Sequence, residues 1–393
     1  MIVSVIHENK IANVFISVSL AGMKQSTRRR NGAPGILDVA SRAGVSPATV
    51  SRFFNSPDML GTNTKARVQA AATELGYIRD RMAGAMHNRF SGTFGLVVPT
   101  INNAIFSELI AAFSNRLLEH DRTMLVASNN YDQTLEISII RSLLERKIDG
   151  IALVCQNHQS SAIEMLQVRS VPVIALWGHQ PEPCIPFVGA DNCLAGKKVT
   201  EHLIHWGHTD IAFIFPETKS NDRAADRKKG AQQAMRLAGL SIPDKRMHTC
   251  PYNLAQAKAT AIDMLMDDKP TAIVCGNDVI AHGVIYAAQQ LKMKLPEELS
   301  VVGIGDFTGS ADIVPSLTTV RLPANQIGKI AADALVDMSE NRKQSHFENQ
   351  VIDTELIVRE SSSKPRPTSS TSQRNRASTQ SGLGLESGFS ESQ

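Results

Sequence analysis

Residues 46–55 gather small and polar side chains at helical spacing around a single arginine, Arg52. Ser46 can cap the amino end of a helix with its hydroxyl group, and Pro47 fits the first helical position, where no amide hydrogen is needed. A guanidinium group on the exposed face of such a helix can donate two hydrogen bonds to O6 and N7 of a guanine. The chemistry that this run predicts is recognition of a nucleic acid.

The other side chains of this predicted helix would make simpler contacts. The proline and the alanine offer apolar surface, for example to a thymine methyl group, whereas the hydroxyl and amide groups suit phosphate oxygens. The competing interpretation of the arginine is an ordinary solvated helix charge. We expect DNA contacts from six positions: Pro47, Ala48, Thr49, Ser51, Arg52 and Asn55.

Two further helices must hold this one in place. Residues 36–43 carry apolar side chains on one face, and Gly44 can take the positive φ that a tight turn requires. Residues 68–75 repeat apolar positions at i, i+3, i+4 and i+7, and Gly76 can end that third helix. The spacing predicts a helix-turn-helix in which Val50 is buried and the second helix enters a major groove.

The charge of the chain is unevenly distributed. The net charge is only +3, yet residues 23–90 hold 11 Lys or Arg against 4 Asp or Glu. A basic amino-terminal module followed by a mildly acidic remainder favours a polyanionic partner for that module alone. With 393 residues, of which 42% are hydrophobic, the chain has room for two or three domains with substantial cores.

The region 92–360 alternates apolar runs with amphipathic stretches. The runs lie at 94–98, 124–127, 150–154, 171–176, 211–215, 272–275 and 300–303. Such a pattern indicates parallel sheets covered on both faces, and its length exceeds one core, so we expect an α/β region with two Rossmann-like lobes. A small molecule would bind at the carboxyl ends of the strands. No glycine-rich phosphate motif accompanies the strands, so we expect no cofactor.

The cysteines and the two ends of the chain carry less information. No pair of the five cysteines has CxxC spacing, so we expect small buried residues in a reducing compartment. The apolar run within residues 1–22 is too short for a membrane span. We expect translation to start at Met23, with a secretory signal as the alternative. Eleven of the last 33 residues are serine, which predicts a disordered tail over 361–393.

In the order of its motifs the chain resembles the LacI/GalR family of transcriptional regulators. The motif Asp-Val-Ala-x-x-Ala-Gly-Val-Ser at 38–46 is followed by Ala-Thr-Val-Ser-Arg at 48–52, Asn55 and Glu-Leu-Gly-Tyr at 74–77. Later matches lie at 191–192, 202–208, 276–281, 300–303 and 315–320. Together they cover residues 36–360, and a series of this length is far more specific than a helix-turn-helix alone.

The resemblance implies a homodimer whose recognition helices read two half-sites of a palindromic operator. It also implies a hinge helix that folds on DNA and wedges an apolar side chain into the minor groove. The chain departs from the family there: Arg79 and Asp80 replace the usual Pro-Asn, Gly84 weakens a helix, and Met86 stands where leucine is expected. Because methionine is unbranched and apolar, we expect Met86 to act as the wedge.

Aligned on these motifs, several aromatic and charged residues fall where relatives hold a small-molecule effector. Aromatic rings can stack on a sugar, while an arginine and an aspartate facing each other can hold neighbouring hydroxyl groups. The competing interpretation of Phe106 and Tyr252 is an ordinary core aromatic, and that of Asp278 is a helix N-cap. The expected effector residues are Ile105, Phe106, Trp177, Asn221, Arg223, Arg227, Tyr252, Asp278 and Asp306.

The charged members of this set leave alternatives open. Two arginines near one cleft would suit a sugar acid, but either could pair with Asp222 or Asp226 instead. Asp306 stands alone where relatives carry paired aspartates, with Gly305 before it. The effector class is therefore a sugar or a sugar acid.

The sequence predicts a cytoplasmic, DNA-binding repressor or activator of the LacI/GalR type, controlled by that effector between the lobes. No nucleophile elbow, metal spacing or phosphate loop is present, so we expect no enzymatic activity. The alternative is a secreted sugar-binding protein without a DNA role. The expected domains are a leader and basic arm at 1–33, the helix-turn-helix at 34–77, the hinge at 78–91, the effector and dimerisation domain at 92–360, and the tail at 361–393.

Overall fold

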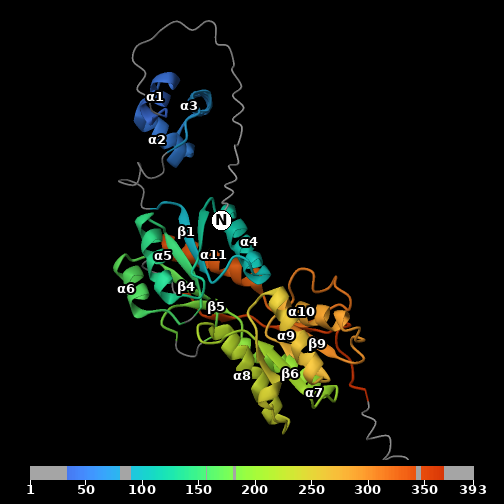
Figure 1. Ribbon diagram of the computed structural model, residues 1–393. Coiled ribbons are helices and arrows are strands. Elements are labelled where there is room, and N and C mark those ends of the chain that lie inside the picture. Colours follow the sequence, from blue (N-terminus) through green and yellow to red (C-terminus); the bar gives the residue numbers. More distant parts are fainter. Residues whose placement is uncertain (1–32, 80–89, 156, 180–182, 342–346, 367–393) are drawn as a thin grey trace, which may run out of the picture. The chain divides into compact units, whose positions relative to one another are not determined.

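The computed structural model describes residues 33–79, 90–155, 157–179, 183–341 and 347–366 (Figure 1). The chain divides into two compact units, Met1–Gly84 and Ala85–Gln393. The predicted wedge, Met86, and most of the predicted hinge, leader and tail lie outside the described residues. No helix within the described ranges is long and apolar enough to cross a membrane.

The described part of the first unit is helical. Its elements are α1 (Ile36–Ala43), α2 (Pro47–Asn55), the 3-10 turn η1 (Pro57–Met59) and α3 (Thr62–Leu75). Gly44 and Gly76, each with φ of 62°, end α1 and α3 in the left-handed conformation expected of them. Val39, Val50 and Val68 are fully buried in a small core shared by the three helices. The helix-turn-helix prediction is confirmed.

The amino-terminal lobe of the second unit contains a six-stranded sheet. Its elements are β1 (Thr93–Val98), α4 (Ala104–Glu119), β2 (Thr123–Ser128), α5 (Gln133–Glu145), β3 (Gly150–Val154), α6 (Ser160–Val168), β4 (Val173–Trp177), β5 (Phe187–Gly189), α11 (Ala324–Glu340) and β11 (Gln350–Val351). The strand order is β11-β5-β4-β3-β1-β2, and every pair is parallel. Helices α4 and α11 cover one face, and α5 and α6 cover the other (Figure 1).

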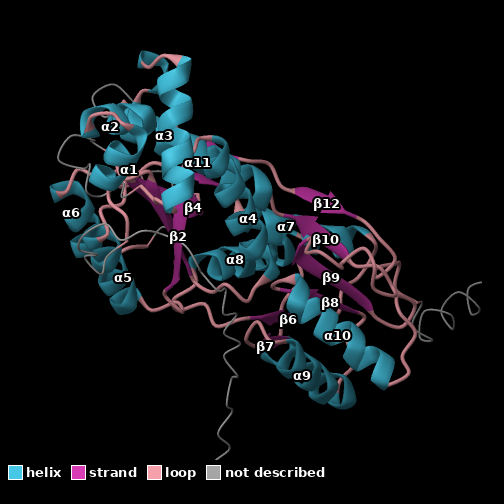
Figure 2. Ribbon diagram, turned by 90° about the horizontal axis from the view of Figure 1, so that it is seen from above, coloured by secondary structure: helices cyan, strands magenta, loops and turns pink. Residues whose placement is uncertain are grey.

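The carboxyl-terminal lobe repeats this plan. Its elements are α7 (Asn192–His205), β6 (Ile211–Phe215), α8 (Asp222–Leu237), η2 (Asp244–Arg246), β7 (Met247–Thr249), α9 (Leu254–Asp267), β8 (Ala272–Cys275), α10 (Asp278–Gln290), β9 (Ser300–Gly305), β10 (Thr318–Arg321) and β12 (Glu355–Ile357). The order is β12-β10-β9-β8-β6-β7, parallel except for the antiparallel edge strand β12 (Figure 2). Two doubly covered, largely parallel sheets confirm the predicted fold class.

Three segments connect the lobes. The chain passes from β5 to α7, returns from β10 to α11, and passes again from β11 to β12. Each lobe is therefore assembled from pieces that are distant in sequence. Strands β3, β4, β6, β8 and β9 are buried along their whole length because both faces of each sheet are covered, which explains their continuous apolar runs. One apolar core joins Phe94 of the first sheet with Phe213 of the second.

Helices α7 and α8 approach until their backbones touch. A Cβ atom at Gly196 would lie 2.0 Å from the carbonyl oxygen of Arg227, and one at Gly230 would lie 1.8 Å from that of Cys193. Only glycine allows this approach. The contact fixes the position of the amino-terminal turns of α8 relative to α7.

Two predictions at the level of single segments are wrong. Ser361 and Ser362 are buried rather than part of a disordered tail, because Ser361 exchanges hydrogen bonds with Val301 and donates its amide to the carbonyl oxygen of Ser316. The ordered chain thus continues past residue 360. Cys184 is exposed, whereas only Cys250 and Cys275 are buried as expected of all five.

Candidate functional site

Helix α2 presents the side chains that were predicted to read DNA. The hydroxyl oxygen of Ser46 accepts a hydrogen bond from the Thr49 amide at 3.1 Å, and Pro47 occupies the first helical position. Arg52 and Asn55 are exposed together with Pro47 and Ala48, whereas Thr49 and Ser51 are half-buried. The exposed face combines small apolar side chains with an amide and a cation, which suits contacts with base edges in a major groove.

An arginine from the predicted hinge holds the carboxyl end of α2. Arg79 donates to the carbonyl oxygen of Phe54 at 3.0 Å and to Oδ1 of Asn55. The amide of Asn55 in turn donates to the Ser51 hydroxyl at 3.1 Å. A cation at this end of a helix also compensates its unpaired carbonyl groups. Asn55 is therefore oriented by protein contacts before any DNA is bound.

The second candidate site lies at the carboxyl ends of the strands in the second unit. The predicted residues follow strands of both lobes: Ile105 and Phe106 begin α4, Trp177 ends β4, Asn221 caps α8, and Tyr252, Asp278 and Asp306 follow β7, β8 and β9. Parallel sheets expose ligand-binding groups at this edge. The fold therefore carries residues that are far apart in sequence to one region.

Aromatic and cationic groups of the two lobes meet there. The rings of Phe106 and Trp177 stand edge to face with centroids 6.3 Å apart. The guanidinium carbon of Arg223, from the other lobe, lies 5.9 Å from the centre of the Phe106 ring. Nη1 of Arg223 also contacts the Cys155 sulfur at 3.5 Å. The contact between Arg223 and the Phe106 ring is a cation–π interaction in a largely desolvated setting, where such interactions are strongest.

Four hydrogen bonds complete this cluster. Arg227 donates from Nε to Oδ1 of Asn192 at 2.8 Å and from Nη1 to the carbonyl oxygen of Gly276 at 3.0 Å. Asn192 donates to the carbonyl oxygen of Trp177 at 3.0 Å, which links the two lobes. Asn221 donates to the phenolic oxygen of Tyr252 at 3.4 Å. Seven predicted residues are thus placed around one contact between the lobes.

The backbone at this contact is strained. Trp177 has φ of 75° and Cys155 has φ of 134°, at the ends of the neighbouring strands β4 and β3. Side chains other than glycine rarely adopt these values, which cost of order 1–3 kcal/mol each and concentrate at functional sites. The indole Nε1 of Trp177 is buried without a hydrogen-bond partner among the described residues. Nη2 of Arg223 is in the same position.

Sequence reasoning missed three members of the cluster. Tyr131 follows β2, Cys155 follows β3, and Asn192 begins α7. Burial raises the pKa of the Tyr131 phenol to about 12, so the group stays a neutral donor. Burial also raises the pKa of the Cys155 thiol. The rule that ligands bind at the carboxyl ends of parallel strands would have found the first two residues.

Asp278 does not take the position expected of it. Its carboxylate is fully buried and accepts hydrogen bonds from the Phe307 amide at 2.9 Å, Ser310 at 2.8 Å and Thr319 at 2.6 Å. It does not cap α10 either, because Asn277 is the N-cap and accepts from Ile280. The carboxylate holds β10 and the loop after β9, so the expected arginine–aspartate pair across a cleft is absent.

Asp306 also lies elsewhere. Its carboxylate pairs with Arg321 and with Arg359, each at 2.7 Å. It lines a hollow of about 450 Å³ together with Glu108 and Glu355, and not the cluster of Phe106. Like Asp278, Asp306 has partners that are distant in sequence. The residues next to it in the sequence therefore do not indicate its role.

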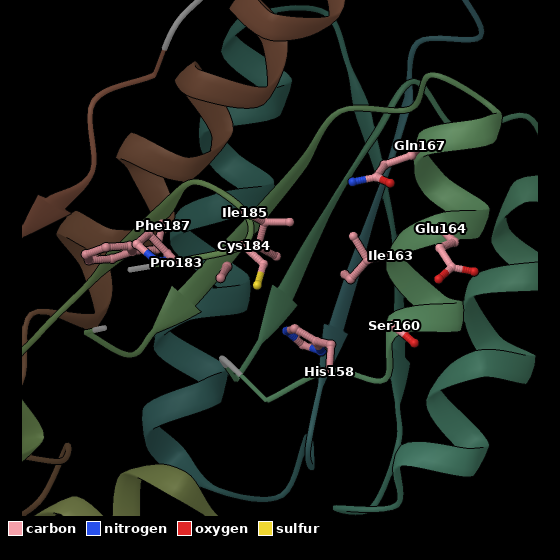
Figure 3. A pocket seen from close by; sticks show the side chains of 10 residues that line it. His158, Ser160, Ile163, Glu164, Gln167, Pro183, Cys184, Ile185 and Phe187 are labelled. Carbon is pink, nitrogen blue, oxygen red and sulfur yellow. The ribbon is translucent and has the colours of Figure 1, made fainter. Parts of the chain in front are cut away.

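A further hollow, of about 320 Å³, lies on the amino-terminal lobe beside α6. Figure 3 shows His158, Ile163 and Cys184 around it. The described residues of its lining include none of the nine predicted effector residues. His158 is already engaged, because its ring contacts Glu136 at 2.8 Å and the carbonyl oxygen of Cys155 at 3.1 Å.

Comparison with known proteins decides the family. Residues 35–80 match the family "Bacterial regulatory proteins, lacI family", and residues 200–362 match the "Periplasmic binding protein-like domain". The HTH-type transcriptional regulator DegA of Bacillus subtilis (strain 168) is 32% identical over 333 residues, which cover 84% of this chain and 98% of DegA. The chain belongs to the LacI family. This LacI-family protein is a DNA-binding transcriptional regulator, as predicted.

Other relatives agree with that assignment. The LacI-family regulator is 28% identical to the HTH-type transcriptional regulator GntR of Escherichia coli (strain K12), over 77% of this chain and 91% of GntR. Its fold matches a crystal structure of the lac repressor dimer bound to operator and the anti-inducer ONPF, with a TM-score of 0.74 and 23% identity over 84% of this chain and 100% of that one. The alternative of a sugar-binding protein without a DNA role is wrong.

Proposed function

We propose that the regulator is a cytoplasmic repressor that binds a palindromic operator as a homodimer. Binding of a sugar or sugar acid between the lobes lowers or raises its affinity for the operator. The observation that carries the DNA part is the exposed, N-capped face of α2 with Arg52 on it. The basic charge of residues 23–90 supports it. The proposal assigns no catalytic reaction to the chain.

The site residues keep distinct parts in this proposal. Arg52 reads a guanine, Pro47 and Ala48 contact base edges, and the hydroxyl and amide groups of the helix contact phosphates. Phe106, Trp177 and Tyr252 would stack on the effector, while Asn221, Arg223 and Arg227 would bind its polar groups. Ile105 is buried beside Phe106 and would shape the apolar wall.

Selection of tight-binding duplexes from a randomised pool tests the DNA part, using the full chain. A palindromic consensus with a central pyrimidine–purine step is the expected result, because such a step is easily kinked by a wedge in the minor groove. Retention that depends only on salt and not on sequence would contradict it. The consensus would also locate the regulated genes.

Exposed apolar side chains of the second unit are candidates for the dimer contact. Val126 on the edge strand β2 is 43% exposed, and Tyr286 on α10 is 39% exposed. Contiguous exposed apolar surface is typical of contacts with another protein, whereas single exposed apolar residues are common on any surface, so the part of Val126 needs a direct test. Sedimentation equilibrium of the full chain should give twice the monomer mass, and replacement of Val126 by Asp should lower the association constant. A monomer at operator-binding concentrations would contradict the proposal.

A further inference from the structure

A buried pair of ionisable groups lies outside the residues that were predicted to bind the effector. The side chains of Glu136 on α5 and His158 after β3 are each 3% exposed, and Nδ1 of the imidazole lies 2.8 Å from a carboxyl oxygen of Glu136. The other carboxyl oxygen accepts a hydrogen bond from the side-chain amide of Asn129 at 3.0 Å. A buried pair of this kind adds little stability by itself, because desolvation offsets the attraction. Its role therefore has to be sought in what it holds in place.

The second ring nitrogen of His158 shows what the pair holds. Nε2 lies 3.1 Å from the carbonyl oxygen of Cys155. Because a carbonyl oxygen can only accept, Nε2 must carry the hydrogen, and Nδ1 then shares a proton with the carboxyl group of Glu136. The carboxyl group thus fixes the orientation of the ring that donates to Cys155.

The backbone of Cys155 needs such support. Its φ of 134° is a conformation that side chains other than glycine rarely adopt, and it persists only where the surroundings enforce it. The amide of Cys155 donates to the carbonyl oxygen of Leu176 on β4 at 3.3 Å, and its carbonyl oxygen accepts from His158. One polar group of this strained backbone is therefore held by the neighbouring strand and the other by the buried pair.

The thiol of Cys155 reaches the other lobe. Its sulfur donates to Oδ1 of Asp222 at 3.7 Å and accepts from Nη1 of Arg223 at 3.5 Å. Both residues belong to the first turn of α8, where they form an ion pair with each other at 2.9 Å. Burial raises the pKa of the thiol, so the sulfur keeps the hydrogen that it donates. A continuous chain of contacts thus runs from α5 through His158 and Cys155 to α8.

We propose that Glu136 and His158 are positioning residues that hold Cys155 against the first turn of α8 and thereby stabilise the contact between the two lobes. This inference goes beyond the proposed function, because it assigns no effector contact to either residue and depends on no particular effector. Any movement of the lobes on effector binding would have to rearrange the Cys155 contact. The pair then contributes to the free-energy difference between the two arrangements of the lobes.

Alkylation of the folded full chain by iodoacetamide, followed by mass spectrometry of each cysteine peptide, tests the proposal. The amide nitrogen of an asparagine side chain lies about where Nδ1 of a histidine lies, and that of a glutamine about where Nε2 lies. We expect His158→Asn to raise the alkylation rate of Cys155 about fivefold to tenfold, because it loses the hydrogen bond to the carbonyl oxygen. His158→Gln can still donate there and should stay within about twofold of the parent.

Other residues of the same chain provide the controls. Cys184 is exposed and should react at the same rate in every variant, whereas Cys275 is fully buried and reports global unfolding. The matched variant is His120→Gln, at the carboxyl end of α4, which removes an imidazole that contacts Asp333 at 2.7 Å. It should leave the alkylation rate of Cys155 unchanged.

Hydrogen exchange in the other lobe gives a readout that a purely local role of His158 would not change. His158→Asn should accelerate exchange of the backbone amides in the first turn of α8, because these residues lose a well-positioned partner in Cys155. His158→Gln should leave that exchange as it is in the parent. Unchanged exchange in α8 of His158→Asn would show that the pair does not act across the lobes.

Two outcomes of the alkylation experiment overturn the inference. One is an equal rate at Cys155 in the parent and in His158→Asn, and the other is acceleration of Cys155 and Cys275 by the same factor, which would indicate a loss of global stability alone. If His158→Asn does not fold, Asn129→Ala decides by the same two criteria, since it removes only the donor to Glu136. It should accelerate the alkylation of Cys155 more than that of Cys275.

Discussion

At the scale of single residues, Arg52 separates DNA recognition from folding. Its side chain is exposed on α2 and is not part of the small core that holds the three helices together. We predict that Arg52→Ala lowers affinity for the selected operator by about 1–3 kcal/mol and relaxes the base preference at one position of each half-site. Competition between operator variants measures both effects, and the melting temperature should not change.

Arg42→Ala is the matched control for this prediction. It also removes an exposed arginine from the first unit, one that pairs with Glu74 at 2.7 Å. An exposed pair of this kind is worth little to stability, and we expect no change of base preference. If Arg52→Ala weakened specific and random duplexes equally, Arg52 would be a phosphate contact instead.

Single residues also show where sequence reasoning reaches its end. The N-cap of α2 could be predicted because Ser46 and its partner are three residues apart. The roles of Asp278 and Asp306 could not, because their partners Thr319 and Arg359 lie 41 and 53 residues away. Ion pairing of Arg223 with Asp222 was one of two alternatives, and only the structure chose between them.

At the scale of elements, the packing of α7 on α8 controls where the two site arginines lie. We predict that Gly230→Ala destabilises the second unit by about 1–3 kcal/mol or more, because the new methyl group would overlap the Cys193 carbonyl oxygen and force the helices apart. The same shift should weaken effector binding. Gln232→Ala, on the exposed side of α8, is the control and should change neither property. Chemical denaturation and calorimetry measure the pair.

The contact between Arg79 and α2 carries a second prediction at this scale. Arg79→Ala removes two hydrogen bonds that hold the chain after α3 against the carboxyl end of α2. We expect operator affinity to fall by about 1 kcal/mol, with base preference unchanged because Arg52 is untouched. Arg79→Lys should recover part of the loss through its charge at the helix end. An Ala variant with full affinity would show that the contact has no part in DNA binding.

Helices and strands were predicted from the sequence more completely than the roles of single residues. The helices of both units and the strands of the second unit follow from hydrophobic periodicity, since covered parallel strands must be apolar throughout and helices on one face only. The edge strand β2 is half-exposed although its apolar run resembles the central ones, because edge position depends on strand order. Strand β11 is two residues long, which is too short for a hydrophobic pattern that would predict a strand.

At the scale of the whole molecule, the last described residues fasten the second sheet. Ser361 donates to the carbonyl oxygen of Val301 at 2.6 Å, and Ser362 contacts both Thr318 and the ring of His202. His208 contacts Thr271 and the carbonyl oxygen of Ser363, at 2.9 Å and 2.8 Å. Serine-rich composition alone predicts disorder here. It does not show that these residues form hydrogen bonds with two histidines and with the first residues of strands β9 and β10.

Those two histidines make stability depend on pH. Burial lowers the pKa of His202, with further lowering by its neighbours His208 and His205, and burial lowers the pKa of His208 despite its bond to Ser363. Below the ordinary value of about 6.5, the unfolded chain therefore binds more protons than the folded one. The stability that the neutral rings provide is present above pH 6.5 and is lost as the pH falls towards their folded pKa values.

We predict that the free energy of unfolding of the second unit falls as the pH is lowered from 7 to 5, and that His208→Gln flattens this dependence. The variant should be less stable than the parent at pH 7, because the imidazole bonds to Thr271 and Ser363 are lost or weakened, and the gap should narrow at pH 5. His282, whose pKa is also lowered by burial, leaves a residual slope in the variant. His205→Gln, at an exposed position of α7, is the control. It removes only a minor contribution to the lowered pKa of His202, so the slope should flatten slightly at most. Urea denaturation at a series of pH values measures the free energy of unfolding of each variant. Parallel curves for the parent and His208→Gln would show that protonation of His208 does not weaken the contacts of residues 361–363.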